Sequence, residues 1–287
     1  MKKQIIAKQK FIDDFVDALK PIYYKQEAIQ ILKALLFDVF NIEYYKIVAN
    51  NSIELTENQL KEFNQIIKRL LQHEPYEYIV ENAHFYGMDL YVNKNVLIPR
   101  PETEELVNLI VQDHHKEHHG LDILDIGTGS GCIALALANR FYPSNVWAIE
   151  KSKEAIAVAK KSDTFYQTKI HFKKGNIFYW KKMKLPKFDI IVSNPPYIPE
   201  AEKKLMHKNV LMYEPHTALF VKNENPLKFY NAIADLALVY LKPNGKLYFE
   251  CNEFNANDVA DMLLDKGFKN VSTNTDLQGK DRMVRAY

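Results

Sequence analysis

The fold class follows from one segment of the chain, Leu124-Asp125-Ile126-Gly127-Thr128-Gly129-Ser130-Gly131-Cys132-Ile133-Ala134. An apolar run precedes the three glycines, and a helical pattern follows them. The whole chain has only 9 glycines in 287 residues, so their concentration here indicates a special backbone path. Glycine lets the backbone turn sharply and approach a ligand closely next to a helix N-terminus. The segment therefore predicts a strand, a ligand-binding loop and a helix.

The glycine spacing narrows the class of ligand. It is G-x-G-x-G, whereas dinucleotide-binding loops have G-x-G-x-x-G. A third glycine two residues after the second suits a nucleoside without a pyrophosphate, and Asp125 before the loop agrees with this. Glu150 ends the next predicted strand, where an acidic residue can accept hydrogen bonds from both ribose hydroxyls. The combination resembles the first motif of S-adenosylmethionine (SAM) methyltransferases, with a dinucleotide site or a plain structural turn as alternatives.

From about residue 100 onward, short apolar runs alternate with helical patterns. The runs cover residues 121–126, 145–149, 170–172, 188–192 and 246–251, and helical patterns include 154–161 and 226–241. Such alternation predicts parallel βαβ units and a doubly wound sheet, which is an α/β, Rossmann-like fold. Residues 282–287 could add a last strand. Residues 243–245, Pro-Asn-Gly, predict a tight turn before a strand.

The first 72 residues read as helical. Phe11, Phe15 and Leu19 recur every four residues, a second helix is expected over 27–40, and a capping box begins at Thr56. This small bundle carries no catalytic constellation, and we interpret it as a docking module. A β-hairpin is expected around Gly87. We therefore predict a helical domain over 1–74, a hairpin linker over 75–99 and a catalytic domain over 100–287.

Composition excludes several classes of protein. Hydrophobic residues make up 47% and charged residues 26% of the chain, which is typical of globular proteins and excludes disorder and collagen-like repeats. No apolar run is long enough to span a membrane, and the lysine-rich start does not match a signal peptide, so we expect a cytoplasmic protein without a membrane partner. The net charge of +2 argues against a dedicated nucleic-acid partner. Cys132 and Cys251 are expected to be reduced, buried thiols.

A second motif, Ser193-Asn194-Pro195-Pro196-Tyr197, follows the apolar run 188–192. That run is the fourth expected strand and should lie beside the first, where open α/β sheets bind ligands at the carboxyl ends of their strands. The two prolines stiffen the loop and remove two N–H donors, while their carbonyl groups remain acceptors. Tyr197 adds a flat apolar face with a polar tip.

This loop suits a planar amino group. The nitrogen of an amide or an aryl amine is a poor nucleophile, because resonance delocalises its lone pair. The Asn194 side-chain oxygen and the Pro195 carbonyl oxygen could hold its two N–H groups and stabilise the positive charge that develops as a methyl group arrives. No general base need act before the transfer. A proline-rich structural turn is the alternative.

The chain resembles the HemK/PrmC family, whose members methylate the glutamine of the Gly-Gly-Gln loop in peptide chain release factors. Asn-Pro-Pro-Tyr is the signature of SAM-dependent enzymes that methylate planar NH2 groups. Further matching blocks are Arg100-Pro101-Glu102-Thr103-Glu104, Tyr213-Glu214-Pro215-His216-Thr217-Ala218-Leu219-Phe220, Phe85-Tyr86-Gly87 and Gly279-Lys280-Asp281-Arg282. The likeness is specific from about residue 75 to the end.

The resemblance implies a SAM-dependent protein-(glutamine-N5) methyltransferase that releases S-adenosyl-L-homocysteine. The residues implied to hold SAM are Asp125, Gly127, Thr128, Gly129, Ser130, Gly131, Glu150, Asn176, Ile177 and Asn194. Those implied to grip or contact the glutamine are Asn194, Pro195, Pro196 and Tyr197, with Asn194, Pro195 and Tyr197 as the catalytic set. Glu150 and Asn176 stand where the family commonly has aspartate, and Asn252 where it tends to have glycine.

Three questions stay open at this point. An adenine-N6 methyltransferase of DNA or RNA, a ribosomal-protein glutamine methyltransferase, and a non-catalytic SAM-binding protein are alternative functions. The acids of residues 100–104 also suit the first turn of a helix, although this leaves Arg100 unexplained. The histidines His114, His115, His118 and His119 have helical spacing, and we expect a solvated helix end and no metal site.

Overall fold

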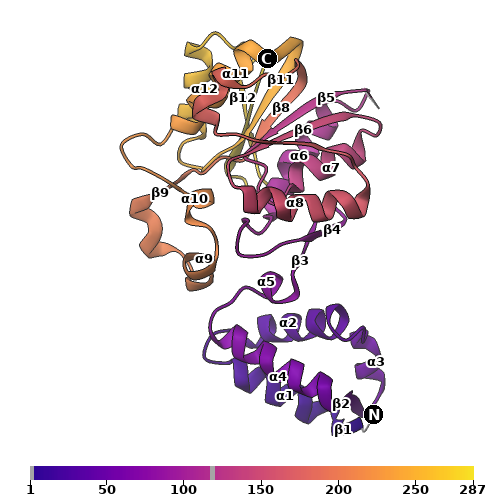
Figure 1. Cartoon of the computed structure of the whole chain (residues 1–287). Coiled ribbons are helices and arrows are strands. Elements are labelled where there is room, and N and C mark those ends of the chain that lie inside the picture. Colours follow the sequence, from indigo (N-terminus) through magenta and orange to yellow (C-terminus); the bar gives the residue numbers. More distant parts are fainter. Residues whose placement is uncertain (1–2, 117–119) are drawn as a thin grey trace. The chain divides into compact units, whose positions relative to one another are not determined.

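The computed structural model describes residues 3–116 and 120–287, which form two compact units (Figure 1). The first unit ends at Asn82 and also takes in His207–Tyr213, whereas the second comprises Ala83–Met206 and Glu214–Tyr287. The division at Asn82 lies inside the segment 75–99 that the sequence predicts as a linker. The return of residues 207–213 to the first unit has no counterpart among the sequence-based expectations.

The first unit is a helical bundle with one small strand pair. Its elements are α1 (Lys8–Leu19), α2 (Lys25–Asp38), α3 (Tyr44–Ala49), α4 (Glu57–Leu71), α5 (Tyr76–Val80), α9 (Lys208–Tyr213), β1 (Lys3–Ala7) and β2 (Ser52–Thr56). Phe11, Phe15 and Leu19 are buried on one face of α1, as their spacing predicts. The antiparallel β1–β2 pair was not expected, because β1 is almost wholly exposed and lacks a buried apolar alternation.

Helix α4 begins with the capping box that the sequence predicts. The Thr56 hydroxyl accepts a hydrogen bond from the Gln59 N–H at 3.3 Å, and the Gln59 side-chain oxygen accepts one from the Thr56 N–H at 2.9 Å. The two bonds satisfy backbone donors that a helix N-terminus would otherwise leave unpaired.

The second unit is built on a seven-stranded, mainly parallel sheet, which confirms the predicted Rossmann-like α/β fold. The strand order is β12-β13-β11-β8-β5-β6-β7, and only the pairings of β13 are antiparallel. The strands are β5 (Asp122–Ile126), β6 (Asn145–Glu150), β7 (His171–Lys174), β8 (Phe188–Ser193), β11 (Leu241–Glu250), β12 (Ser272–Thr275) and β13 (Asp281–Ala286). Because β6 and β8 flank β5 on opposite sides, the strand order reverses there, and a crevice is expected at the carboxyl ends of β5 and β8.

Helices cover both faces of this sheet. They are α6 (Pro101–Asp113), α7 (Cys132–Arg140), α8 (Lys153–Tyr166), α11 (Lys228–Tyr240) and α12 (Ala256–Asp265). Ile123 of β5 is buried with α6 and α7, whereas the next residue, Leu124, is buried with α11 and α12. Successive strand residues point to opposite faces, so both faces of the central strands must be apolar, as their continuous apolar runs predict.

A β-hairpin opens the second unit. Strands β3 (Asn82–Phe85) and β4 (Met88–Tyr91) are joined by Tyr86 and Gly87, whose φ angles are +48° and +74°. Positive φ at both central residues is the geometry of a two-residue type I′ turn. The hairpin around Gly87 is therefore as the sequence predicts.

The predicted turn at 243–245 is instead part of β11. The strand runs from Leu241 to Glu250, and its register with β8 shifts between Leu241 and Lys246. Asn244, with φ +65°, provides the local bend while strand pairing resumes on either side. The strand therefore begins earlier than the Pro-Asn-Gly signal indicates.

The remaining elements are short and lie between the main strands and helices. They are η1 (Ile177–Lys182), β9 (Ile198–Pro199), η2 (Glu200–Leu205), α10 (His216–Leu219) and β10 (Phe220–Val221), and β9 pairs with β10. Within residues 3–116 and 120–287, no helix combines the length and apolar character that a membrane crossing needs.

Candidate active site

The glycine loop and the Asn-Pro-Pro-Tyr loop start at neighbouring positions of the sheet. Strands β5 and β8 pair in parallel, with Asp125 opposite Val192. One residue further on, the buried Ser193 hydroxyl donates a hydrogen bond to the Ile126 carbonyl oxygen at 2.6 Å. This bond fixes the starting points of the two loops relative to each other, where the topology places a ligand crevice.

The three loop glycines have two different structural roles. Gly127, Gly129 and Gly131 all have positive φ, at +76°, +55° and +84°. A methyl group on Gly131 would come within 3.0 Å of the Ala159 Cβ of α8, so this glycine allows α7 and α8 to pack closely. A methyl group on Gly127 would meet nothing within 4 Å, and one on Gly129 only the Gly127 oxygen at 3.9 Å. The first two glycines therefore face open space that a ligand can enter.

Glu150 ends β6, as predicted, and its side chain lies at this loop. Its carboxylate accepts hydrogen bonds from the Gly129 N–H at 3.1 Å and from the Ser152 N–H at 2.8 Å. A carboxylate has about four acceptor positions, so these two bonds leave capacity for further donors. Glu150 thus braces the loop from the end of β6 and keeps acceptor capacity there.

Asp125 is buried beneath the same loop. One of its oxygens accepts a hydrogen bond from the Thr128 hydroxyl at 2.5 Å, which ties the middle of the loop to the end of β5. Burial raises the pKa of the Asp125 carboxyl to about 7. Its observed contact is with the loop, so its clearest role is to shape the glycine turn.

Asn176 and Ile177 follow β7 on the next strand along the sheet. The Gly175 N–H donates to the Glu150 carbonyl oxygen at 2.9 Å, which brings this segment to the end of β6. The Asn176 side-chain oxygen accepts from the Phe178 N–H at 3.1 Å and caps η1, while Ile177 is buried. The structure therefore gathers the glycine loop, Glu150 and residues 176–177 at one edge of the sheet.

The Asn194 side chain is held by residues that sequence reasoning did not select. Its amide nitrogen donates to the Thr103 hydroxyl at 3.1 Å, and that hydroxyl donates to a Glu250 carboxylate oxygen at 2.7 Å. The Tyr197 hydroxyl donates to the other Glu250 oxygen at 3.1 Å. Thr103 and Glu250 are 2% and 1% exposed. Four side chains from three separate segments thus form one hydrogen-bonded group.

The two acceptor oxygens expected to grip a substrate are not engaged elsewhere in the protein. Over the residues that the structure describes, neither the Asn194 side-chain oxygen nor the Pro195 main-chain oxygen accepts a hydrogen bond from another protein group. Pro195 is buried, and Asn194, Pro196 and Tyr197 are half-buried. The loop can therefore offer two oxygens to a planar NH2 group from outside.

Comparisons with known proteins agree with this geometry. Residues 117–281 match the family model described as a methyltransferase domain, and residues 12–80 match the PrmC N-terminal domain. A release factor glutamine methyltransferase of Flavobacterium psychrophilum is 40% identical over 273 residues, covering 94% of this chain and 95% of the relative. A protein of the same name from Bacteroides thetaiotaomicron is 39% identical, covering 94% and 96%. The chain belongs to the release factor glutamine methyltransferase family.

A solved structure supports the fold of this family member. A methyltransferase from Pyrococcus furiosus aligns with a TM-score of 0.52 and 20% identity, covering 76% of this chain and 95% of that one. At this level of identity the likeness concerns the fold alone. It agrees with the α/β architecture that the glycine segment and the alternating runs predict.

Two family blocks meet through an ion pair that explains Arg100. The guanidinium of Arg100 donates to the Glu214 carboxylate at 2.5 Å, and the Ile98 N–H donates to the same carboxylate at 3.2 Å. Glu214 is 4% exposed. The arginine therefore compensates a buried charge just before α6, which a preference for acids in a first helical turn does not explain.

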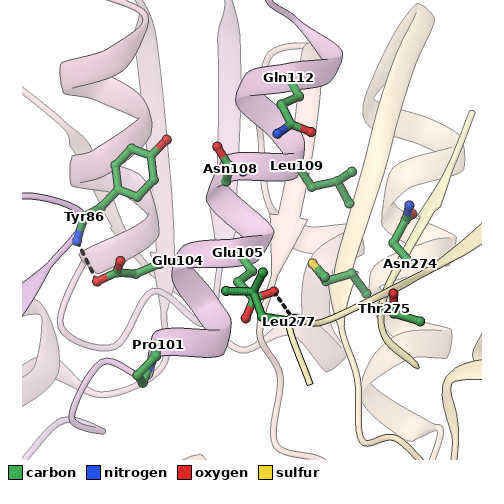
Figure 2. Close-up of a pocket in the computed structure, with 11 residues that line it drawn as sticks. Tyr86, Pro101, Glu104, Glu105, Asn108, Leu109, Gln112, Asn274, Thr275 and Leu277 are labelled. Atoms are coloured by element: carbon green, nitrogen blue, oxygen red, sulfur yellow. Dashed lines mark hydrogen bonds between the residues drawn. The ribbon is translucent and has the colours of Figure 1, made fainter. Parts of the chain in front are cut away.

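Figure 2 shows a pocket that α6 lines, together with two hydrogen bonds that hold α6 to neighbouring segments. Glu104 accepts a hydrogen bond from the Tyr86 N–H of the hairpin, and Glu105 accepts one from the Leu277 N–H between β12 and β13, each at 2.9 Å. The residues lining this pocket include none of the predicted SAM or glutamine residues. These two bonds thus anchor the turn of α6 that carries Thr103.

The histidine prediction is wrong for His114. We expected a solvated helix end, but His114 is 4% exposed, and its ring nitrogen lies 3.1 Å from the Tyr248 hydroxyl. Helix α6 ends at Asp113, and His114 turns against the sheet. His118 and His119 lie outside the described residues. Among the described residues, no three His, Cys, Asp or Glu side chains cluster in a way that could hold a metal ion.

The two cysteines are free thiols. Cys251 is buried, and Cys132 is partly buried at the start of α7. Burial raises the pKa of Cys132 to about 12 and also raises that of Cys251, so both stay protonated at neutral pH. A raised pKa is typical of structural cysteines and not of thiol nucleophiles.

Proposed function

We propose that this protein transfers a methyl group from SAM to the side-chain amide nitrogen (N5) of the glutamine in the Gly-Gly-Gln loop of peptide chain release factors. The observation that carries the proposal is the Asn-Pro-Pro-Tyr loop, with two unengaged acceptor oxygens next to an open glycine loop. The names of the relatives from Flavobacterium psychrophilum and Bacteroides thetaiotaomicron support release factors as the substrate.

The glycine loop and its neighbours fit SAM. The open space over Gly127 and Gly129 admits a ligand, and Glu150 retains acceptor capacity for ribose hydroxyls. We assign Asn176 and Ile177, at the same edge of the sheet, to the adenine. When bound, SAM supplies an electrophilic methyl carbon, whose bond to sulfur breaks with the electron pair left on sulfur. The loop residues act by binding and by orienting that methyl group toward the second loop.

The Asn-Pro-Pro-Tyr loop would handle the glutamine. The Asn194 side-chain oxygen and the Pro195 carbonyl oxygen accept the two N–H groups of the substrate amide and fix its plane, while Tyr197 packs against it. These two oxygens also stabilise the positive charge that grows on nitrogen as the new carbon–nitrogen bond forms. The surplus proton leaves the nitrogen afterwards, so the site needs no general base for the transfer.

The helical domain is proposed to dock the release factor. The fit of its sequence to the PrmC N-terminal domain, together with the lack of a catalytic constellation, supports a binding role for residues 1–74. Residues 75–99 would link it to the catalytic domain over 100–287.

The direct test uses labelled SAM and purified release factor. We expect label in wild-type release factor and none in a variant whose Gly-Gly-Gln glutamine is replaced by alanine, with mass spectrometry locating one added methyl group on that peptide. Equal labelling of the two factors would refute the proposal. Label in DNA, RNA or a ribosomal protein, with none in the release factor, would instead support one of the alternative methyl acceptors.

A further inference from the structure

We infer that Thr103 and Glu250 are positioning residues for this reaction: Glu250 orients the Thr103 hydroxyl, and Thr103 holds the Asn194 amide so that its oxygen, and not its nitrogen, is presented to the substrate. The inference rests on the proposed function and adds two residues to its machinery. Neither residue belongs to the glycine loop or to the Asn-Pro-Pro-Tyr loop.

The direction of the hydrogen bonds carries this inference. An ionised carboxylate only accepts hydrogen bonds, so the Thr103 hydroxyl must donate its single hydrogen to Glu250. Toward Asn194 the same hydroxyl can then only accept, and the Asn194 group 3.1 Å away must be the NH2. A flipped amide would place two oxygen atoms face to face without a hydrogen between them.

The orientation matters because the two ends of an asparagine amide are chemically opposite. The oxygen accepts from a substrate N–H, whereas an NH2 group in the same place would face the N–H donors of the glutamine amide and repel them. A free asparagine side chain can adopt either orientation at little cost. The Thr103–Glu250 pair removes the unproductive one before the substrate arrives, which is preorganisation.

The chain holds both residues rigidly. Phe249 of β11 pairs with Ser193 of β8, so Glu250 stands beside the start of the Asn-Pro-Pro-Tyr loop. Thr103 lies in the first turn of α6. The next two residues, Glu104 and Glu105, accept hydrogen bonds from the backbone N–H groups of Tyr86 and Leu277 (Figure 2). The positioning pair therefore sits on a strand and a helix, which hold a side chain more precisely than a loop does.

Protonation of Glu250 would reverse the direction of the hydrogen bonds that join Glu250, Thr103 and Asn194. Burial raises the pKa of this carboxyl to about 7, and Glu102 of α6 adds to the rise, while the hydrogen bonds from the threonine and Tyr197 and the charge of Arg282 on β13 oppose it. The Tyr230 hydroxyl of α11 donates a hydrogen bond to the main-chain oxygen of Glu250. A protonated carboxyl can donate to the threonine hydroxyl, which can then turn its hydrogen toward Asn194 and favour the flipped amide. Methyl transfer should therefore decline as pH falls through about 7.

The test compares Thr103→Val with Thr103→Ser in methylation of full-length release factor by the full-length enzyme. Valine keeps the shape of threonine and removes the hydroxyl, whereas serine keeps the hydroxyl. We expect kcat to fall about 10- to 100-fold in Thr103→Val, because the reacting groups lose their alignment, and to stay near the wild-type value in Thr103→Ser. SAM affinity, measured by calorimetry, should be nearly unchanged in both variants.

Two further measurements separate positioning from a general loss of packing. Ser162→Ala removes a buried hydroxyl of α8 that accepts a hydrogen bond from the Tyr91 N–H at 2.9 Å and that belongs to neither loop, so this change should leave kcat unchanged. In addition, the decline of kcat toward acid pH in the wild type should be smaller in Thr103→Val, because Glu250 no longer reaches Asn194 through Thr103, whereas Asp125, whose pKa is also about 7, still titrates beneath the glycine loop.

The outcomes are distinct. A wild-type enzyme that methylates no release factor refutes the proposed function and this inference with it. An active wild type with an equally active Thr103→Val variant, or with Thr103→Ser as impaired as Thr103→Val, overturns the inference alone. The same holds if the acid decline of kcat persists unchanged in Thr103→Val.

Discussion

Replacing Gly131 with alanine should destabilise the fold through two separate effects. A residue other than glycine pays about 1–2 kcal/mol for a left-handed conformation such as the φ of +84° found here. The new methyl group would also lie 3.0 Å from the Ala159 Cβ and 3.3 Å from the Leu135 Cδ1, and overpacking of this kind costs about 1–3 kcal/mol. The free energy of unfolding should therefore fall by about 2–5 kcal/mol.

Two other glycines provide the controls. Gly267 has φ +92°, and a methyl group added to it would meet nothing within 4 Å, so Gly267→Ala should show only the backbone cost of about 1–2 kcal/mol. Gly129→Ala should cost about as little in stability. Its methyl group, however, enters the space that we assign to SAM, so SAM affinity should fall about 10-fold, equivalent to about 1.4 kcal/mol.

The assay is urea unfolding followed by circular dichroism, with calorimetry for SAM binding. A Gly131→Ala, Ala159→Gly double variant should recover part of the lost stability, because it removes the methyl contact, although glycine inside α8 costs about 1 kcal/mol. The reasoning is refuted if Gly131→Ala is no less stable than Gly267→Ala. It is also refuted if Gly129→Ala binds SAM as tightly as the wild type.

Three further predictions concern the catalytic loop and the buried charges. Asn194→Ala should lower methyl transfer about 100- to 1000-fold with intact folding, measured with labelled SAM, and a fully active variant would contradict the assigned role. Burial raises the Glu250 pKa to about 7, so the folded state keeps a proton that the unfolded state loses above its ordinary pKa, and this residue's contribution to stability is lost as pH rises toward and through 7. Glu250→Gln should therefore be more stable relative to wild type at pH 8 than at pH 5. A difference in urea unfolding that does not change with pH would argue against the raised pKa. Arg100→Met should lower the free energy of unfolding by about 2–3 kcal/mol because it leaves the buried Glu214 charge without this partner, and an unchanged urea midpoint would show that the pair is not needed.

Much of the catalytic unit was predictable because its signals are local. The glycine loop, the hairpin turn at Gly87 and the capping box at Thr56 each need only a few consecutive residues, and each forms as expected. The adjacency of β5 and β8 follows from general rules of open α/β sheets, and it brings the two predicted loops together.

The features that sequence reasoning missed depend on distant register. Thr103 and Glu250 are 147 residues apart, and their contact with Asn194 requires the pairing of β11 with β8 and the position of α6 above them. The matching block around Thr103 was a usable signal, but nothing local marked the threonine as a partner of the loop. In the same way, His114 is buried against Tyr248, which belongs to a strand far along the sequence.

The return of residues 207–213 to the helical unit has a topological consequence. The polypeptide passes from one unit to the other after Asn82, after Met206 and after Tyr213, so no single cut can divide it into its two units. A fragment that stops at Asn82 would leave out α9, including the Tyr213 hydroxyl that donates to the Gln72 carbonyl oxygen at 3.0 Å. Evolutionary exchange or deletion of the helical unit would therefore require coordinated changes at two places in the gene.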